Sequence, residues 1–313
     1  MSQFNYHNPV MLKEVLSFVK EEKIIYVDLT LGRAGHANEI LKRIKKGSSF
    51  YGVDRDEDAL SFSEERLKPF EKNISLHFLH SRYSRAIEQL RQSGVAGSDL
   101  ILMDIGVSSP QFDDPSRGFS YRYDSDLDMR MDQKAKLTAK DIVNTYSEKE
   151  LCRVFKDLGQ CKIYYPVVKK IIEVRQEKEI RTTFELVDII KSSLPRKELM
   201  KQGHPAKQFF LGLRYEVNQE IDELKQGLVS AIEFLNPKGR LVIISFNSEE
   251  DRIVKNTMKS YVQIQTGDKY HPILGQEESK YILLTKKPLV PSEEEIEENN
   301  RCKPSILRAI ERK

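Results

Sequence analysis

The sequence predicts an α/β protein with a mainly parallel sheet, interrupted by a smaller helical insertion. Over the first hundred residues, short apolar runs alternate with turns and helix-like stretches, at Ile24–Leu29, Ser49–Val53, Ser75–Leu79 and Leu100–Met103. Such alternation is typical of βαβ units and a parallel sheet. From Thr138 to about Leu199, apolar residues instead recur at spacings of three and four without a strand-like run, which predicts a helical block.

The remaining elements follow in chain order. We expect helices at Ala37–Ile44, near Gln208–Leu235 and at Glu250–Met258. Two further strands are expected at Arg240–Phe246 and Tyr281–Thr285. The end of the chain is biased, with five glutamates in Pro291–Asn300 and a basic stretch at Arg301–Lys313. Because like-charge runs are usually solvated, we expect an acidic linker and a basic tail. The tail either contacts RNA, packs on the surface or lacks fixed structure.

Composition limits the class of protein. In the 313 residues, 51 basic side chains nearly balance 48 acidic ones, so nucleic-acid binding would require local segregation of charge. Cys152, Cys161 and Cys302 form no C-x-x-C pair and are expected to be thiols in a reducing compartment. No apolar run approaches the roughly 20 residues that span a bilayer, and the histidines lack metal-ligand spacing. We therefore expect a cytoplasmic protein with no membrane partner and no metal.

A turn rich in small residues follows the first expected strand. It runs from Asp28 to His36 and contains Gly32, Ala34 and Gly35. Small residues let a ligand approach the backbone, and the N-terminus of the following helix offers free N–H groups to an anion. Ligands bind at the carboxyl ends of the strands in such sheets. The turn predicts a cofactor site; the alternative is a tight turn with no ligand.

Two acids distinguish between cofactors. Asp54 ends the second expected strand, where a carboxylate can accept hydrogen bonds from both hydroxyls of a ribose. This position fits NAD and S-adenosylmethionine equally. Asp28, however, would attract the ammonium group of a methionine moiety and repel a pyrophosphate. Ala34 and His36 also stand where a dinucleotide turn has glycines. The sequence therefore favours S-adenosylmethionine.

A polar segment begins at the end of the fourth expected strand. Asp104 is followed by Gly106, Ser108, Ser109 and Gln111, which would surround the methyl group of the cofactor with a carboxylate and two hydroxyls. Residues 110–135 are too long and too polar for an ordinary connection. Ordering the arginines, acids and aromatics of this loop is costly without a functional purpose. The alternative is a solvated loop whose charges pair with one another.

Eight stretches occur in the order of a known family and span almost the whole chain. They are HNPVMLKEVL from His7, DLTLGRAGHA from Asp28, GVDRDEDAL from Gly52, DIGVSSPQFDDPSRGFSYRYDSDLDMRMD from Asp104, TAKDIVN from Thr138, HPAKQFFLGLRYEVNQEI from His204, GRLVIISFNSEEDRIVK from Gly239 and a degenerate motif at Arg301–Lys313. On these motifs the sequence resembles the MraW/RsmH family, the cytosine-N4 methyltransferases of bacterial small-subunit ribosomal RNA.

The resemblance implies a domain organisation and a set of cofactor contacts. Residues 1–112 and 208–290 would form a Rossmann-like class I methyltransferase domain, residues 113–207 a catalytic loop and helical RNA-binding insertion, and residues 291–313 the acidic linker and basic tail. By position, S-adenosylmethionine contacts fall on Ala34, Gly35, His36, Asp54, Tyr83, Asp104 and Gln111. Tyr83 would pack against the adenine.

The sequence departs from the family pattern at several positions. The family usually has glycine at Ala34, Asn-Phe at Arg82–Tyr83, histidine at Asn247, arginine at Gln208 and Gly-Glu-Glu at Gly159–Cys161. The changes at Ala34 and Tyr83 should keep the cofactor pocket. The changes at Asn247 and Gln208 remove charged or protonatable groups, which puts the fit of the substrate in more doubt than the binding of the cofactor.

The loop chemistry indicates methyl transfer to an exocyclic amine. Asp104, together with Ser108, Ser109 or a loop carbonyl, would accept N–H bonds from the amine and aim its lone pair at the methyl group, so that positioning and electrostatics drive an in-line displacement. No cysteine follows a proline, which argues against the thiolate attack that methylation at cytosine C5 requires. Only the resemblance narrows the target to N4 of a cytidine in the decoding region of 16S rRNA.

Partner contacts are expected mainly in the loop and the insertion. The candidates for RNA binding, chiefly to phosphates, are Arg117, Arg122, Arg130, Lys207, Arg214 and Asn218; each arginine could instead form a structural salt bridge. Phe112 or Phe119 would stack on a base taken out of its stack, or else belong to the core. The expected partner is 16S rRNA in the small ribosomal subunit, not DNA. The competing functions are a non-catalytic ribosome-assembly protein that binds S-adenosylmethionine and RNA, and a small-molecule amine methyltransferase.

Overall fold

The chain divides into two compact units. The computed structural model describes residues 9–263 and 279–313, without the side chain of Ser109. The first unit, here called the sheet unit, comprises Met1–Gly106 and Asp222–Lys313, and the second, the helical unit, comprises Val107–Ile221. The expected α/β fold with a helical insertion is confirmed. The boundaries expected at 112 and 208 differ, because the first turn of the loop and the whole helix α11 (Lys207–Asn218) belong to the helical unit.

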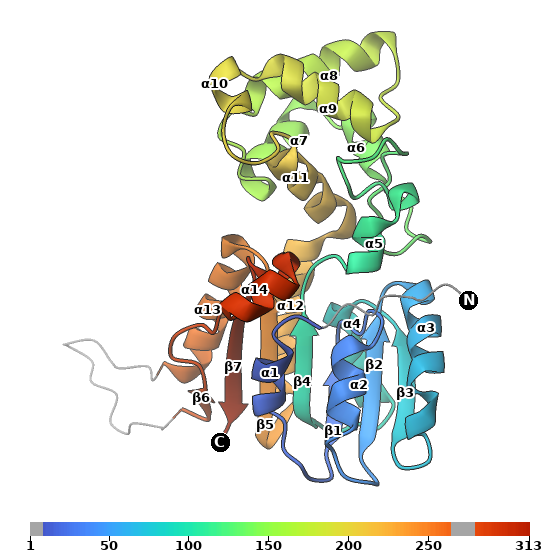
Figure 1. The fold of residues 1–313 in the computed structure, drawn as a ribbon, viewed down its shortest axis with the longest axis vertical. Helices are drawn as coiled ribbons and strands as arrows, with labels where there is room; N and C mark the ends of the chain where they lie inside the picture. Colours follow the sequence, from blue (N-terminus) through green and yellow to red (C-terminus); the bar gives the residue numbers. More distant parts are fainter. Residues whose placement is uncertain (1–8, 264–278) are drawn as a thin grey trace, which may run out of the picture. The chain divides into compact units, whose positions relative to one another are not determined.

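The sheet unit is built on a mainly parallel sheet (Figure 1). The strands that the structure describes run in the order β3-β2-β1-β4-β5-β7-β6. Strands β1 to β5 pair in parallel, and β7 pairs antiparallel with both β5 and β6. Their bounds are β1 Ile25–Asp28, β2 Ser49–Asp54, β3 Ser75–His80, β4 Ser98–Asp104, β5 Leu235–Ser245, β6 Tyr281–Leu283 and β7 Ile306–Arg312.

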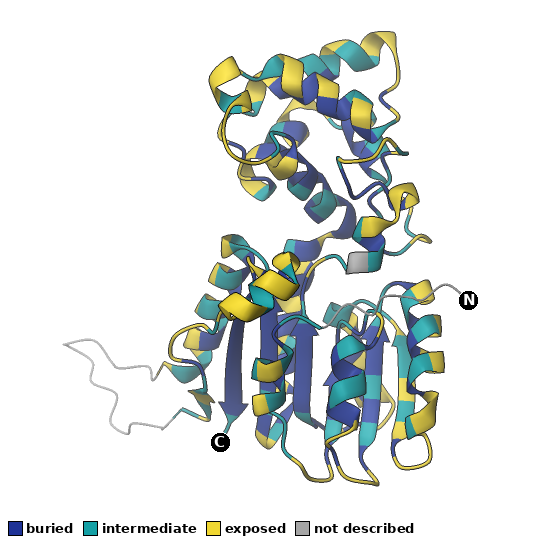
Figure 2. Ribbon diagram, viewed as in Figure 1, coloured by how far each residue is buried: buried dark blue, intermediate teal, exposed yellow. Residues whose placement is uncertain are grey.

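Helices connect these strands and cover the sheet. Their bounds are α1 Leu12–Ser17, α2 Gly35–Leu41, α3 Glu57–Leu67, α4 Tyr83–Gln92, α12 Glu220–Glu233, α13 Ser248–Val262 and α14 Glu293–Glu298, with short 3₁₀ turns at Lys68–Phe70 and Asn300–Cys302. The central strands are buried almost throughout (Figure 2). Tyr26, Phe50 and Leu102 of three strands pack with Ile40 of α2 in one core. Burial on both faces explains why these strands read as continuous apolar runs.

The acidic stretch expected as a solvated linker forms the short helix α14, which buries none of its residues. The basic end, expected as a tail, instead forms β7, a buried strand between β5 and β6. The charges in this strand are paired: Arg308 binds Asp251 through two hydrogen bonds of 2.6 and 2.9 Å, and Glu311 binds Arg240 at 2.8 Å. The basic residues of the tail therefore serve the sheet.

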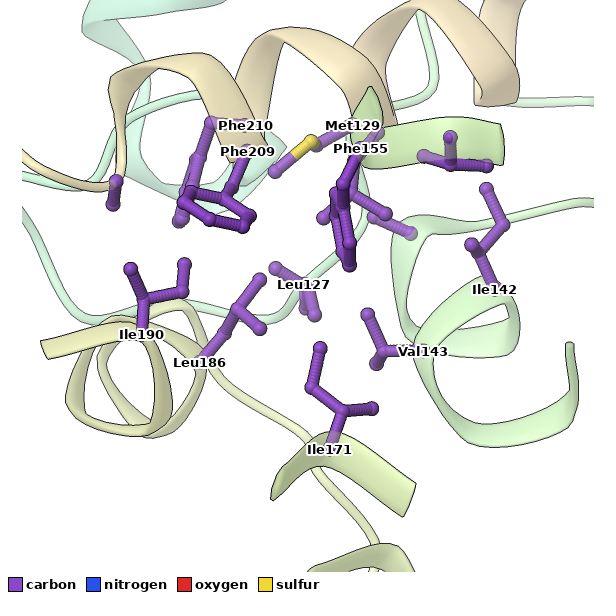
Figure 3. Packing of buried hydrophobic residues seen from close by; sticks show 14 of the residues in the cluster. Leu127, Met129, Ile142, Val143, Phe155, Ile171, Leu186, Ile190, Phe209 and Phe210 are labelled. Carbon is purple, nitrogen blue, oxygen red and sulfur yellow. The ribbon is translucent and has the colours of Figure 1, made fainter. Parts of the chain in front are cut away.

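The helical unit packs short helices around its own apolar core. Its elements are α5 Ser109–Asp113, a 3₁₀ turn at Pro115–Arg117, α6 Ala139–Thr145, α7 Glu148–Arg153, a π-helical turn at Val154–Leu158, α8 Tyr165–Glu177, α9 Thr183–Ser193, α10 Arg196–Leu199 and α11. Thr138, Ser147 and Thr182 begin three of these helices with capping boxes. Phe155, Ile171, Leu186 and Phe209 converge from different helices (Figure 3).

The single helix expected near Gln208–Leu235 is two helices. Gln219 adopts a left-handed conformation with φ 54° and separates α11 from α12. The break lies beside the boundary between the two units. The apolar pattern continues through it because both helices bury one face, so periodicity alone did not reveal the interruption.

Candidate active site

Asp28 lies at the carboxyl end of β1 and holds the turn that follows. The Tyr26 hydroxyl donates to Oδ2 at 2.9 Å, and the Thr30 backbone N–H donates to Oδ1 at 3.1 Å. The side chain is buried, and burial raises its pKa to about 6. A nearby cation would offset this burial cost. The observed contacts give Asp28 a structural role in the turn; direct contact with an ammonium group stays a prediction.

The turn itself carries two left-handed residues. Gly32 has φ 52° and Ala34 has φ 55°. The Gly32 N–H donates to Asp54 Oδ2 at 2.7 Å, which ties the turn to the end of β2. An L-residue in the left-handed region costs about 1–2 kcal/mol relative to glycine. This cost explains the glycine that the family usually places at Ala34.

Asp54 ends β2 as expected. Its Oδ1 accepts from the Asp56 N–H at 2.9 Å and its Oδ2 from Gly32. Burial raises its pKa. Because a carboxylate has about four acceptor positions, the two backbone bonds fix the group and leave lone pairs for a diol.

Asp104 ends β4 beside His36. The Asp104 N–H donates to Thr30 Oγ1 at 2.6 Å, and its Oδ2 lies 3.7 Å from His36 Nδ1. His36 Nε2 lies 2.8 Å from the Val10 carbonyl, so Nε2 carries a proton. Burial lowers the pKa of His36. The ring is therefore neutral at pH 7 and turns its bare Nδ1 toward Asp104, at a distance too long for a hydrogen bond.

One oxygen of Asp104 is unsatisfied. Oδ1 is buried and has no hydrogen-bond partner among the described residues, although the side chain as a whole is 27% exposed. Burial, and then the charge of Glu250, raise the pKa of Asp104 to about 7. A buried acceptor without a donor costs about 1–3 kcal/mol, and such orphans are rare in folded proteins. Asp104 is thus prepared to accept a hydrogen bond from a ligand.

Tyr83 begins α4 and packs on α12. A Cβ at Gly227 would lie 2.5 Å from Tyr83 Cδ2, so only glycine leaves room for the ring there. The neighbouring Arg82 donates to Glu223 at 3.3 Å. The Arg82–Tyr83 pair, which departs from the family pattern, therefore has fitting partners in this chain. Stacking of Tyr83 on an adenine stays a prediction.

Sequence reasoning missed Thr30 and Glu250. Thr30 fixes the backbone of Asp104 and belongs to the turn motif that starts at Asp28. Glu250 is buried, accepts from the Phe246 N–H at 2.8 Å and raises the pKa of Asp104. Asn247 accepts from the N–H groups of Glu249 and Glu250 at 3.0 Å each and so caps α13. The family's histidine position thus holds an effective helix cap here.

In the helical unit, Ser108 and Gln111 form a capping box on α5. The Ser108 N–H donates to Gln111 Oε1 at 3.0 Å, and the Gln111 N–H donates to Ser108 Oγ at 3.4 Å. Gln111 is buried. Both side chains shape the start of the loop, which sequence reasoning did not foresee. The side chain of Ser109 lies outside the described part of the chain, so its catalytic role stays a prediction, as does that of Ser108.

The loop after α5 pairs its own charges. Arg117 is buried and donates through Nη2 to the carbonyls of Arg130 and Met131, at 3.1 and 2.9 Å. Arg130 binds both oxygens of Asp128, at 2.8 and 2.7 Å. A Cβ at Gly118 would lie 2.3 Å from the Asp126 carbonyl. The alternative of a loop with internally paired charges therefore describes the contacts of these arginines, and their assignment as RNA contacts stays a prediction.

Two further expected RNA contacts are structural. Arg214 binds Glu220 through bonds of 2.8 and 3.0 Å. Asn218 is buried, accepts from the Met131 N–H at 2.8 Å and donates to the Met129 carbonyl at 2.7 Å. These bonds hold α11 and the loop in place, and contact of either residue with RNA stays a prediction.

Of the remaining residues expected to contact RNA, some are buried in the core and others are exposed. Phe119 is buried in the core of the helical unit and is not a stacking platform, whereas Phe112 is half-buried against that core. Arg122 and Lys207 are exposed and stay candidates.

Comparison with known proteins identifies the family. The model of the MraW methylase family matches residues 4–313. The chain belongs to the MraW methylase family. It is similar to Ribosomal RNA small subunit methyltransferase H of Lachnospira eligens, with 44% identity over 308 residues, 98% of this chain and 97% of that protein. The protein of that name from Spiroplasma kunkelii is 45% identical over 313 residues and 98% of each chain.

A third relative agrees with this placement. Ribosomal RNA small subunit methyltransferase H of Clostridioides difficile is 41% identical over 309 residues, 98% of this chain and 99% of that protein. TrmN from Thermus thermophilus aligns with 97% of this MraW family member and 48% of its own chain at a TM-score of 0.42 and 11% identity, a likeness too weak to support any inference. Within residues 9–263 and 279–313, no helix is long and apolar enough to cross a membrane. The expected membership of a methyltransferase family is confirmed.

Proposed function

We propose that this MraW family member transfers a methyl group from S-adenosylmethionine to N4 of a cytidine in the decoding region of 16S rRNA. The observation that carries the proposal is the unsatisfied, buried Oδ1 of Asp104 at the end of β4. An exocyclic amine supplies the missing N–H donor. The names of the similar proteins supply the substrate class, small-subunit ribosomal RNA.

The sheet unit offers groups that fit the cofactor. S-adenosylmethionine, when bound, supplies an electrophilic methyl group on a cationic sulfur. The turn from Gly32 to Gly35 and the start of α2 would hold its methionine part, and Asp54 its ribose. Asp28 and Asp104, whose pKa values are raised by burial to about 6 and about 7, would both gain from a nearby positive charge, which favours their ionised forms.

Asp104 then acts on the amine. The lone pair of cytosine N4 is delocalised into the ring, so the nitrogen is a weak nucleophile. A hydrogen bond from N4–H to Asp104 Oδ1 favours a pyramidal nitrogen and directs its lone pair toward the methyl carbon. Bound S-adenosylmethionine would supply the methyl group to N4 and leave as S-adenosylhomocysteine, and the methylated, cationic amine would release its proton to solvent. Positioning and electrostatics supply the acceleration.

The cysteines support a direct transfer without a covalent intermediate. Cys161 is buried, and burial raises the pKa of its thiol to about 12. Burial also raises the pKa values of Cys152 and Cys302. Only a thiolate attacks a pyrimidine ring effectively. All three cysteines are therefore poorly suited to methylation at carbon, which is consistent with a direct transfer to nitrogen.

The test is methylation of small ribosomal subunits from a strain that lacks this enzyme. The full chain is incubated with the subunits and tritiated S-adenosylmethionine, and the RNA is digested to nucleosides. We expect label in N4-methylcytidine, and its loss in Asp104→Asn. Label in another nucleoside would refute the proposed chemistry. Cofactor and subunit binding without any label would favour the non-catalytic assembly protein.

A further inference from the structure

A basic pocket lies on the sheet unit, away from the candidate active site. It has a volume of about 190 Å³ and is formed by α13 and the segment that follows β6. In the sheet order, β5 and β7 stand between β4, which carries Asp104, and β6. The polar groups in its lining are Lys255, Lys259, Thr285, Lys286, Lys287 and Arg308.

Among the residues that the structure describes, the lysines of this pocket have no neutralising partner. No hydrogen bond or ion pair joins their ammonium groups to any residue in the described ranges. Asp251 on α13 is already paired, because both of its oxygens bind Arg308, at 2.6 and 2.9 Å. Among the described lining residues there is no carboxylate. Four lysine ammonium groups around one small space repel each other, and an anion would relieve that repulsion.

Thr285 adds a hydroxyl group to the lining. It is buried, and its Oγ1 accepts from the Ala309 N–H at 3.0 Å. A hydroxyl has one proton to donate, and within the described residues that proton has no acceptor. Met258 and Leu283 make part of the lining apolar, which strengthens electrostatic interactions there by lowering the local dielectric.

We propose that this pocket binds a phosphate group of the RNA backbone during methylation. The inference rests on the proposed function, which supplies a polyanionic substrate. Lysines contact phosphates as mobile point charges and carry no sequence information. Among the described lining residues there is no aromatic side chain and no asparagine or glutamine, and the one arginine, Arg308, is bound to Asp251, so the lining suits a phosphate better than a base. The pocket therefore anchors the RNA, while the target base is selected elsewhere.

The experiment measures the salt dependence of RNA binding. The full chain and its Lys286→Ala/Lys287→Ala variant are titrated with small ribosomal subunits that lack the modification, between about 50 and 200 mM salt. We expect the slope of log affinity against log salt to fall by about one per lysine removed. Cofactor affinity should be unchanged. The Lys286→Arg/Lys287→Arg variant should keep the salt slope of the wild-type protein.

A matched variant removes the same charge elsewhere. Lys45→Ala/Lys46→Ala lies in the exposed segment before β2 and should leave the slope unchanged. Equal slopes for this variant and Lys286→Ala/Lys287→Ala would overturn the pocket assignment. So would loss of inorganic phosphate binding in the pocket variant without a change in the RNA slope, since that result marks a small-anion site. A protein that binds subunits through the pocket but transfers no methyl group would refute the proposed function alone.

Discussion

The loop of the helical unit and the basic pocket of the sheet unit are both rich in cations, yet they use them in opposite ways. Arg117 and Arg130 of the loop each bind backbone carbonyls or a carboxylate. Lys286 and Lys287 of the pocket have no such partner within the described residues. Residue type made the arginines look like RNA contacts. Pairing, not residue type, separates a structural cation from one that is available to a ligand.

The same comparison applies to acids. Asp128 is paired with Arg130, whereas Asp104 keeps one buried oxygen without a donor. We expect Asp104→Asn to lower methyl transfer by about 100- to 1000-fold, the usual effect of removing a preorganised electrostatic group. Asp128→Asn should act through folding instead. Single-turnover rates with saturating cofactor distinguish the two; a normal rate for Asp104→Asn would exclude a role for the negative charge of Asp104.

The paired arginine should matter most for stability. Arg117→Met removes a donor from the carbonyls of Arg130 and Met131 and leaves them buried, which should lower the free energy of unfolding by about 2–4 kcal/mol. Arg122→Met, at an exposed neighbour, should change it by less than about 0.5 kcal/mol. Urea denaturation of both variants measures the difference. A large change in the salt slope of RNA binding with normal stability would instead show that Arg117 is an RNA contact.

Sequence reasoning succeeded where burial leaves a local pattern. The first four strands were predicted to within two residues because each is a continuous apolar run. It failed at β7, where Arg308 and Glu311 interrupt the apolar pattern. Their partners, Asp251 and Arg240, lie 57 and 71 residues away in the chain. A buried charge reads as a surface residue until its distant partner is known.

The same distinction between local pattern and tertiary contacts applies to the site residues. The acids at the strand ends could be predicted, because parallel strands bring their carboxyl ends to one edge of the sheet. The partners of Arg117 and Asn218 could not, since they are loop carbonyls and N–H groups whose positions depend on the folded loop. The pocket lysines gave no local motif at all, because α13 and the segment after β6 meet only through tertiary packing.

The unsatisfied acid should make stability depend on pH. The pKa of Asp104 is raised from 3.8 to about 7, so the folded state binds a proton more tightly than the unfolded state. Stability from this group is present below pH 4 and is lost as pH rises toward 7. The difference in pKa corresponds to at most about 4 kcal/mol, and partial solvation reduces the effect to about 1–2 kcal/mol. The Asp104→Asn variant should therefore be more stable than the wild-type protein at pH 8 but not at pH 4. Thermal unfolding at the two pH values measures this difference.

The smallest effect concerns backbone strain in the turn. Ala34 is held at φ 55°, where an L-residue costs about 1–2 kcal/mol. Glycine removes that cost but gains freedom in the unfolded chain, about 0.4–1 kcal/mol. Ala34→Gly should therefore raise the free energy of unfolding by about 0.5–1 kcal/mol and leave cofactor affinity unchanged. Chemical denaturation and calorimetric titration with S-adenosylmethionine measure the two quantities. A decrease in stability would show that the Ala34 methyl group, buried against the core, stabilises the turn more than its conformation strains it.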